Sequence, residues 1–290
     1  MEKNHRVRRT LLYVPASDQH KCEKALGLEC DGIIFDLEDA VSSDKKLYAR
    51  RFICAFLKDI DAADKEILVR INQITGQWGF EDLQTLIPCC PDTIIIPKAC
   101  KRDIIAADVF VSYLEAKHSC KTRTGFIPLI ETVSALEELS NIVEASERIN
   151  GVQFGAEDFT KELEIKRTSQ GNEIAFARSK LTMTARAYGL DAIDTPYINY
   201  KDEAGFAKEL DYIKSIGMTA KTAIHPAQLK KINEAFIPTE QEVVQAREII
   251  DAFEKSVREG KGACSLNGSM IDAPIVERAL KVVKRHTMMQ

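Results

Sequence analysis

The strongest constraint on the fold is a pattern that recurs along the chain: a short run rich in Ile, Val and Phe, then a polar turn, then a longer amphipathic stretch. Most of the short runs are continuously apolar rather than alternating, which is typical of parallel strands covered on both faces. They predict eight strands, at residues 11–16, 32–39, 66–72, 93–99, 125–131, 151–158, 191–198 and 220–226.

Helical periodicity fills the gaps between these strands. The predicted apolar stripes are Leu47, Tyr48, Phe52, Ala55 and Phe56; Val133, Leu136, Leu139 and Val143; and Ile174, Arg178, Leu181 and Ala185, the last with one polar member. Eight β-then-α units with right-handed crossovers predict a (β/α)8 TIM barrel, and no linker rich in Pro, Gly or Ser interrupts them. The alternative is an open doubly wound sheet, but no glycine fingerprint marks a nucleotide crevice.

The 290 residues of the chain exceed the roughly 250 of a typical barrel. Residues 227–236 can serve as the eighth helix. Beyond them, Val243, Ala246, Ile250, Phe253 and Val257 form an apolar stripe at helical spacing, and residues 273–285 predict a last helix. We therefore expect a catalytic barrel at residues 1–236 and a helical appendage at 237–290, docked on the barrel or on a neighbouring subunit.

Composition excludes several classes of partner. With 40 Lys and Arg against 44 Asp and Glu, the formal charge is -4, so no global field draws the protein to nucleic acid or to an anionic membrane. No stretch approaches the roughly 18 apolar residues of a membrane helix. The eight cysteines are dispersed without a CxxC pair, which indicates reduced thiols and a cytoplasmic protein.

Acidic side chains follow three of the predicted strands. In barrel enzymes the site lies at the carboxyl ends of the strands, where Asp36, Glu38, Glu131 and Asp158 would meet. Oxygen ligands without cysteine suit a hard cation such as Mg²⁺. We therefore expect Glu131 and Asp158 to bind Mg²⁺; the alternative is that these acids only cap the helices that follow them.

One basic residue ends a buried strand. Arg70 requires an anionic partner there and would suit a substrate carboxylate or a developing oxyanion. The alternative is a structural ion pair with Asp36 or Glu38. We interpret His225 as bonded to the backbone and the vicinal Cys89 and Cys90 as incidental.

These residues belong to motifs whose order resembles that of the citrate lyase β-subunit-like family of acyl-CoA carbon–carbon lyases, which includes citryl-CoA, malyl-CoA and citramalyl-CoA lyases. The motifs are Arg9-Thr10-x-Leu12-Tyr13-Val14-Pro15, Asp36-Leu37-Glu38-Asp39-Ala40-Val41, Val69-Arg70-Ile71-Asn72, Pro97-Lys98, Ile130-Glu131-Thr132, Gly155-Ala156-Glu157-Asp158, Asp194-Thr195-Pro196-Tyr197, Ile224-His225-Pro226-x-Gln228 and Ser265-Leu266-Asn267-Gly268-x-Met270-Ile271-Asp272-x-Pro274.

The resemblance implies a Mg²⁺-dependent barrel enzyme that assembles as a homotrimer or hexamer. Carried over by position, Glu131 and Asp158 are the metal ligands, Arg70 and Asp272 are catalytic, and the second of these enters a neighbouring subunit's site as general acid/base. The resemblance further implies that Asp36 and Glu38 hold metal-bound waters, that Arg9 and Lys24 bind CoA, and that Arg70, Ala156 and Glu157 bind the substrate.

The implied reaction is cleavage of a 3-hydroxyacyl-CoA into a keto acid and a short acyl-CoA through a thioester enolate, so the chain is expected to be an oxo-acid-forming lyase. Two alternatives stay open: hydrolysis of the malyl-CoA thioesterase or synthase type, and a β subunit that works with other citrate lyase subunits on a carrier-bound citryl thioester. The segment 167–173 resembles true citrate lyase β subunits, whereas Ile224-His225-Pro226 resembles stand-alone lyases, so the acyl group is not fixed.

Overall fold

A computed structural model describes residues 7–60 and 65–288 of the chain. Its contacts divide the described residues into a barrel unit, Arg8–Asn233, and a second unit that begins at Glu234 and also includes Val7. The predicted division at residue 236 coincides with the end of α10 (Leu229–Phe236), the helix within which the contacts change from one unit to the other. Residues 1–6 of the predicted barrel domain lie outside the described residues.

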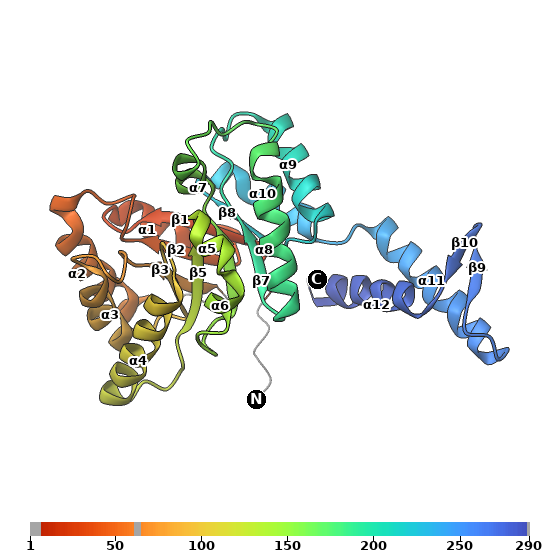
Figure 1. The fold of residues 1–290 in the computed structure, drawn as a ribbon, viewed down its shortest axis with the longest axis horizontal. Coiled ribbons are helices and arrows are strands. Elements are labelled where there is room, and N and C mark those ends of the chain that lie inside the picture. Colours follow the sequence, from red (N-terminus) through yellow and green to blue (C-terminus); the bar gives the residue numbers. More distant parts are fainter. Residues whose placement is uncertain (1–6, 61–64, 289–290) are drawn as a thin grey trace. The chain divides into compact units, whose positions relative to one another are not determined.

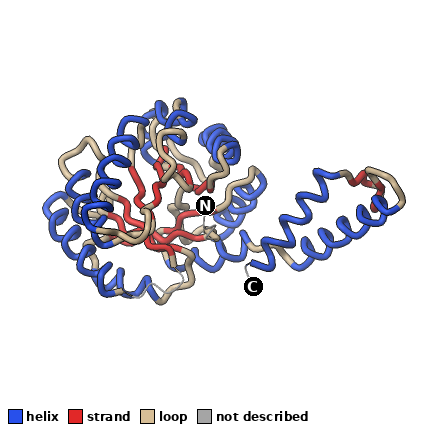
Figure 2. The backbone as a smooth tube through the Cα atoms, turned by 90° about the horizontal axis from the view of Figure 1, so that it is seen from below, coloured by secondary structure: helices blue, strands red, loops and turns tan. Residues whose placement is uncertain are grey.

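Eight parallel strands close into a barrel in chain order, with β1 paired to both β2 and β8 (Figure 1). They are β1 Thr10–Pro15, β2 Gly32–Asp36, β3 Glu66–Arg70, β4 Thr93–Ile96, β5 Gly125–Ile130, β6 Gly151–Phe154, β7 Asp191–Asp194 and β8 Ala220–Ala223. Figure 2 shows the strands as an inner ring surrounded by helices. The predicted (β/α)8 barrel with C-terminal helices is confirmed, and an open sheet is excluded.

The predicted strands extend further at their carboxyl ends than the strands of the structure do. From the second strand on, each begins where it was predicted, but β2 ends at Asp36 instead of residue 39 and β6 at Phe154 instead of residue 158. Polar side chains just past the ladder turn the chain into loops and helices, so Asp158 lies in the first turn of α7 (Ala156–Glu162) and not on a strand.

Helices cover the outside of the barrel. They are α1 Gln19–Leu26, α2 Lys46–Asp59, α3 Gly79–Leu86, α4 Lys101–His118, α5 Val133–Glu137, α6 Leu139–Val143, α7, α8 Ala175–Ala187, α9 Glu203–Ser215 and α10. The stripe predicted on α8, including Arg178, is fully buried.

The stripe predicted on α2 is wrong, because Leu47 and Tyr48 are 46% and 53% exposed. Instead Ala49 and Ile53 face the core together with the charged Lys46 and Arg50. The amine of Lys46 donates to the carbonyls of residues 37 and 38 at 2.7 and 2.6 Å, and Arg50 bonds to Asp82 of α3 at 2.6 Å. These polar contacts, invisible to an apolar periodicity, determine which face of α2 turns inward.

The barrel interior is packed with apolar side chains from alternating strand positions. A buried cluster contains Leu11, Ile34, Leu68, Ile95, Ile127, Leu129, Ile193 and Ala220. At the amino-terminal ends of the strands, Arg8 closes the barrel by donating to Glu66 at 2.6 and 2.7 Å and to Asp191 at 3.0 Å. The barrel is therefore a filled core that opens to ligands at its other end.

A buried charge cluster lies between β7, β8 and the helices outside them. Lys221 of β8 donates to Asp194 and Glu209, both at 2.7 Å, and Arg178 of α8 donates to the same two carboxylates at 2.8 to 2.9 Å. Asp194, the first residue of the motif Asp194-Thr195-Pro196-Tyr197, has its side chain fully buried in this cluster. Two cations and two anions balance one another there, which makes burial of all four tolerable.

The second unit contains two helices and a hairpin: α11 Glu240–Arg258, β9 Cys264–Leu266, β10 Ser269–Ile271 and α12 Ala273–Met288. Asn267 and Gly268 have φ of 50° and 80°, as required for the tight two-residue turn of a hairpin. These two strands were not predicted from the sequence. Val243 and Ala246 of the predicted α11 stripe are buried, whereas Val257 is 53% exposed.

Among the described residues, no helix has the length and apolar character needed to cross a lipid bilayer. The expected cytoplasmic location stays a prediction.

The charge cluster yields a stability prediction. Lys221→Met leaves Asp194 and Glu209 with one cation fewer in a buried site, so we expect a loss of about 3–5 kcal/mol in unfolding free energy. Lys231→Met is the matched control: its bond to Glu203 is 2.6 Å long but the two side chains are 37% and 78% exposed, so we expect a loss of less than about 1 kcal/mol. Urea unfolding of the two variants provides the comparison, and equal losses would contradict this account of the cluster.

Candidate active site

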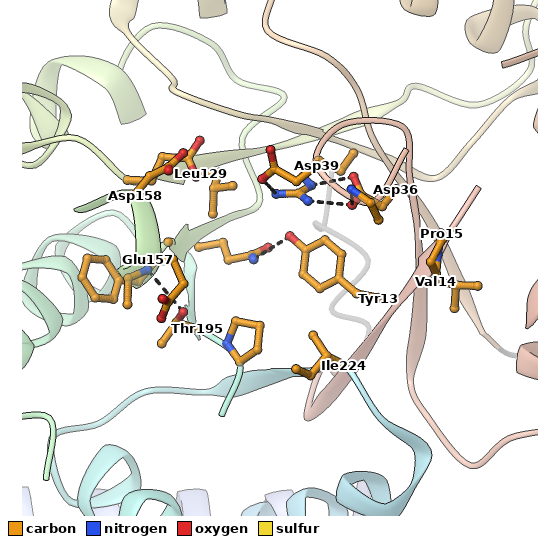
Figure 3. Close-up of a pocket in the computed structure, with 18 residues that line it drawn as sticks. Tyr13, Val14, Pro15, Asp36, Asp39, Leu129, Glu157, Asp158, Thr195 and Ile224 are labelled. Atoms are coloured by element: carbon orange, nitrogen blue, oxygen red, sulfur yellow. Dashed lines mark hydrogen bonds and ion pairs between the residues drawn. The ribbon is translucent and has the colours of Figure 1, made fainter. Parts of the chain in front are cut away.

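A cavity of about 390 Å³ opens at the carboxyl ends of the barrel strands. Figure 3 shows Tyr13 pointing into its middle, with Asp36 and Asp39 on one side and Glu157 and Asp158 on the other. Of the residues predicted for the site, the structure brings these together on the cavity wall: Asp36, Arg70, Glu131, Ala156, Glu157 and Asp158.

Glu131 follows β5 and is 4% exposed. Its Oε1 accepts a 2.7 Å hydrogen bond from the backbone N–H of Lys98. A Cβ on Gly155 would lie 2.6 Å from the Cβ of Glu131, so the absence of a side chain at residue 155 makes room for the carboxylate. Burial, with the nearby charges of Glu38 and Asp158, raises the pKa of Glu131 to about 8 against the Lys98 hydrogen bond.

Lys98 connects the acidic groups of the site. Its ammonium nitrogen lies 3.6 Å from Glu38 Oε1 and 3.6 Å from Asp158 Oδ2. Its backbone has φ of 46°, an uncommon conformation for a residue other than glycine. One residue thus contacts Glu131 through its backbone and two further carboxylates through its side chain. Lys98 was visible in the sequence only as part of the Pro97-Lys98 motif, which predicted no role for it.

Arg70 ends β3 and is held by two parallel hydrogen bonds to Asp36, of 2.7 and 2.6 Å. The ion pair weighed as the alternative for Arg70 is therefore present. Asp36 also accepts from the backbone N–H groups of Glu38 at 2.9 Å and Ala40 at 3.1 Å. Four bonds use the accepting capacity of this carboxylate, so Asp36 fixes the orientation of Arg70.

Glu38 is 8% exposed, and burial raises its pKa to about 7 although Arg70 and Lys98 oppose the shift. Its Oε2 lies 3.1 Å from Arg70 Nη1 but accepts no hydrogen bond of good geometry. A buried carboxylate oxygen left in this state favours a bound proton, water or cation nearby.

Two further polar groups of the cavity carried no predicted role. Gln153 lies inside the barrel on β6, 1% exposed, and donates to the hydroxyl of Tyr13 at 2.8 Å. The guanidinium of Arg70 lies 5.0 Å from the centre of the Tyr13 ring. In the sequence, Gln153 could have been identified because it is the one polar side chain in the strand Gly151–Phe154.

The donor set fits a hard divalent cation. Glu131, Asp158 and Glu38 offer only carboxylate oxygens, and Glu131 lies close enough to the other two to feel their charges. Within the described residues, no three His, Cys, Asp or Glu side chains converge on one point as metal ligands do. Two carboxylates completed by water and substrate oxygens are the usual coordination of Mg²⁺, whereas a full protein cage would suit Ca²⁺.

Other predicted site residues lie elsewhere. Arg9 precedes β1, at the amino-terminal end of the barrel, and binds Asp31 through bonds of 2.9 and 2.6 Å. Lys24 is exposed in the last turn of α1. Asp272 belongs to the second unit, where its side chain accepts from the N–H of Ile275 at 3.3 Å at the start of α12. The structure does not bring Arg9 to the cavity, because its backbone enters the barrel at the opposite rim.

His225 and Arg167 lie near the mouth of the cavity, and both are hydrogen-bonded within the protein. His225 accepts a 3.1 Å hydrogen bond from the backbone of Ala227, as expected of a backbone-bonded histidine. Arg167 donates to Glu157 at 2.9 Å and is therefore already paired with an anion at the edge of the cavity.

The fold and this site define a class of protein: a (β/α)8-barrel enzyme with carboxylates and an arginine gathered at the carboxyl ends of its strands. Residues 9–226 match the family model described as HpcH/HpaI aldolase/citrate lyase. The chain belongs to this family, which confirms the resemblance found in the sequence motifs.

Relatives match over almost the whole length. The chain is 34% identical to citrate lyase subunit beta of Escherichia coli, covering 98% of this chain and 95% of the relative. It is 33% identical to a mitochondrial citramalyl-CoA lyase of Rattus norvegicus, over 97% and 87%. It is 34% identical to a (3S)-malyl-CoA thioesterase of Cereibacter sphaeroides, over 97% and 93%. The expected enzyme class, an oxo-acid-forming carbon–carbon lyase, is confirmed.

Solved structures share the fold. CitE from Mycobacterium tuberculosis, crystallised with magnesium, acetoacetate and coenzyme A, has a TM-score of 0.81 at 24% identity and covers 97% of this chain and 98% of its own. A citrate lyase from Burkholderia xenovorans has a TM-score of 0.86 at 18% identity, over 97% and 92%.

The raised pKa of Glu131 predicts a pH dependence. In the unfolded chain this carboxyl ionises near pH 4.5, whereas in the metal-free folded protein it holds its proton until about pH 8. The unfolded state therefore binds fewer protons in this window, and stability falls as pH rises through it. We expect Glu131→Gln, which cannot ionise, to gain stability relative to the parent protein between pH 5 and 8.

The measurement is thermal unfolding of both proteins in a metal chelator across that range. Other titrating groups are common to the two proteins, so the difference between their midpoints isolates residue 131. Parallel pH profiles would show that Glu131 ionises normally and would contradict the assignment.

Proposed function

We propose that the protein is a Mg²⁺-dependent lyase that cleaves a citryl-, malyl- or citramalyl-CoA type thioester into a keto acid and a short acyl-CoA. The observation that carries this proposal is the convergence of Glu131, Asp158 and Arg70 on one cavity at the carboxyl rim. The named lyase relatives support the reaction. The magnesium and coenzyme A in the CitE complex support the metal and the thioester class.

Glu131 and Asp158 are the residues that would hold Mg²⁺. A bound Mg²⁺ supplies Lewis-acid stabilisation of negative charge on the carboxylate and hydroxyl oxygens of the substrate, an effect of several kcal/mol. The Lys98 N–H and the space left at Gly155 keep the Glu131 carboxylate in place. Asp158, whose side chain is 30% exposed, presents its carboxylate from the open side of the cavity.

Arg70 stabilises the second oxygen on which charge develops, that of the thioester enolate. Burial alone would lower the pKa of Arg70, but the nearby Tyr13, Asp36 and Glu38 raise it well above its ordinary value, so Arg70 stays charged. Asp36 fixes the plane of the guanidinium through two parallel bonds, which places a preorganised cation at the cavity wall. Ala156 and Glu157 line the same wall and are the proposed contacts for the substrate's acyl end.

Proton transfer at the enolate carbon is assigned to Asp272 of a neighbouring subunit. Within the cavity, Asp36 is bonded to Arg70 and to the backbone, Asp39 contacts Arg70, and Glu157 pairs with Arg167. The role of Asp272 follows from the family resemblance of its motif. Asp272 stands where a hairpin meets α12, at the point where the tip of the second unit changes direction. We therefore propose that residues 237–290 form an appendage that completes a site in a homotrimer or hexamer.

CoA binding is proposed for Lys24, whose exposed amine in the last turn of α1 is available to a phosphate. The same role is proposed for Arg9, whose guanidinium pairs with Asp31 in the described structure.

A second candidate is thioester hydrolysis, favoured by the 34% identity to a malyl-CoA thioesterase. A third is action as a β subunit on a carrier-bound citryl thioester, favoured by the citrate lyase β relatives. Product analysis separates the three: a lyase gives a keto acid and acyl-CoA, a thioesterase gives free CoA and an intact hydroxy acid, and a β subunit turns over only the carrier-bound substrate.

The metal assignment predicts that Glu131→Gln and Asp158→Asn each lose at least 100-fold in kcat and bind Mg²⁺ at least tenfold more weakly. Both variants keep the shape of the side chain and remove a ligand charge, which the metal site requires. Turnover of citryl-, malyl- and citramalyl-CoA, with identification of the keto acid, and calorimetric titration with Mg²⁺ provide the measurements.

The matched control is Glu137→Gln on α5, an acid 66% exposed that bonds only to Lys180 in the described structure. It should behave as the parent protein. Retention of full turnover by Glu131→Gln or Asp158→Asn would remove the basis of the proposal.

The role of Asp272 predicts complementation between inactive chains. Glu131→Gln lacks a metal ligand in its barrel, and Asp272→Asn lacks the proton donor of its appendage. In a mixed oligomer, an Asp272→Asn barrel would receive an intact Asp272 from a Glu131→Gln neighbour. We therefore expect co-refolding or subunit exchange to restore activity, up to about a quarter of the parent value for random pairing.

Each variant alone is the control, together with a mixture kept below the temperature of subunit exchange. If both variants are inactive and their exchanged mixture stays inactive, Asp272 does not act across a subunit boundary.

A further inference from the structure

Four of the eight free cysteines gather near the amino-terminal ends of β4 and β5. Cys54 lies on α2, Cys89 ends the 3-10 turn Ile87–Cys89 after α3, Cys90 follows it, and Cys120 lies just beyond α4. The active-site cavity opens at the opposite ends of the same strands. No step of the proposed reaction uses these thiols.

Two of these thiols face each other directly. The sulfurs of Cys54 and Cys89 are 2.8 Å apart, about 0.75 Å more than the roughly 2.05 Å of a disulfide bond. Both sulfurs also lie near the carbonyl oxygen of Thr85, at 3.5 and 3.6 Å. The side chains are therefore already oriented toward one another, and a small rotation would bring the sulfurs to bonding distance.

The surroundings favour a pair over a metal centre. Burial, together with the nearby Cys90, raises the pKa of the Cys120 thiol to about 11. Across the part of the chain that the structure describes, no three cysteines or other ligating side chains are close enough to share an ion. Both Cys54 and Cys89 are half-buried, which leaves them open to a small oxidant.

We propose that Cys54 and Cys89 are a redox modification site that closes into a disulfide linking α2 to the turn after α3. With a hydroperoxide as oxidant, the two thiols lose two protons and two electrons, the sulfur–sulfur bond forms, and the O–O bond of the peroxide breaks. With hydrogen peroxide the products are the disulfide and two molecules of water. A dithiol reductant reverses the change by thiol–disulfide exchange.

The position of this bond gives it a mechanical consequence. Next to this bond, Arg50 of α2 and Asp82 of α3 already link the two helices at 2.6 Å, and Asp82 accepts from the backbone N–H of Asn72 at 2.9 Å. The disulfide would therefore fasten the helices that support the segments after β2 and β3. Closing a loop of about 35 residues should raise the midpoint of thermal unfolding by several degrees.

The test is peptide mapping of the whole protein after treatment with hydrogen peroxide, alkylation and tryptic digestion without reductant. Cys54 falls in the tryptic peptide 52–58, Cys89 and Cys90 share the peptide 71–98, and Cys120 falls in 118–121. The expected product is a 52–58/71–98 cross-link that disappears on adding dithiothreitol.

Because one peptide holds both vicinal cysteines, two matched variants identify the partner. Cys89→Ser should abolish the cross-link and the gain in thermal midpoint, whereas Cys90→Ser should keep both. A cross-link that survives Cys89→Ser, a link from 71–98 to 118–121 in its place, or no link in the parent protein when its exposed Cys90 is fully oxidised would each overturn the proposal.

The position of Lys98 supports a second inference, which rests on the proposed function. Its ammonium lies between Glu38 and Asp158, 3.6 Å from each, where the positive charge partly neutralises the acidic site. We further propose that Lys98 is a positioning residue that holds these carboxylates together in the absence of metal and competes with Mg²⁺ for them.

Removing this charge should tighten Mg²⁺ binding, since two like charges about 4 to 5 Å apart repel each other even in a well-solvated site. Calorimetry of Lys98→Met should give a Mg²⁺ dissociation constant at least threefold lower than that of the parent protein. The matched control is Lys101→Met, an exposed lysine at the start of α4, which should leave the constant unchanged. An unchanged or weaker Mg²⁺ affinity in Lys98→Met overturns this proposal, whereas absence of Mg²⁺ binding in the parent protein overturns the proposed function itself.

Discussion

Closure of the barrel by pairing of β1 with β8 is the constraint on which the rest of the structure depends. It brings eight carboxyl ends to one rim, so side chains more than a hundred residues apart in the chain share one cavity. Tyr13 of β1 and Gln153 of β6 bond across that cavity at 2.8 Å. Closure also removes exposed strand edges, and it requires that the polar groups outside the strands be paired locally, as they are in the cluster of Arg178, Asp194, Glu209 and Lys221.

The rim is built with an excess of negative charge. Glu38 and Glu131 are both buried, and burial raises the pKa of each, to about 7 and about 8. Two cationic side chains, Arg70 and Lys98, lie next to these carboxylates and are held differently. Arg70 is fixed by Asp36 and keeps its charge, whereas Lys98 is 37% exposed and sits at 3.6 Å from its partners. The fixed guanidinium of Arg70 can stabilise a developing oxyanion. The ammonium of Lys98 is held less tightly, so a metal ion can replace it between the carboxylates.

The sequence predicted the barrel because parallel buried strands need continuous apolar runs, and these were visible from Leu11 to Ala223. It placed Glu131 and Asp158 at the rim for the same reason. It could not identify the inward face of α2, because Lys46 and Arg50 are buried by partners in other segments. Nor could the sequence show that Arg9 enters the barrel at the amino-terminal rim, where Asp31 binds its guanidinium.

The central claim is that Glu131 and Asp158 jointly bind one divalent cation at the cavity. Its most direct test is a crystal structure of the protein soaked in Mn²⁺, in which anomalous scattering locates the metal. The account predicts one strong peak at bonding distance from both carboxylates, with the Lys98 ammonium displaced from its position between Glu38 and Asp158. A peak bound elsewhere, or none at a Mn²⁺ concentration that supports turnover, would contradict it.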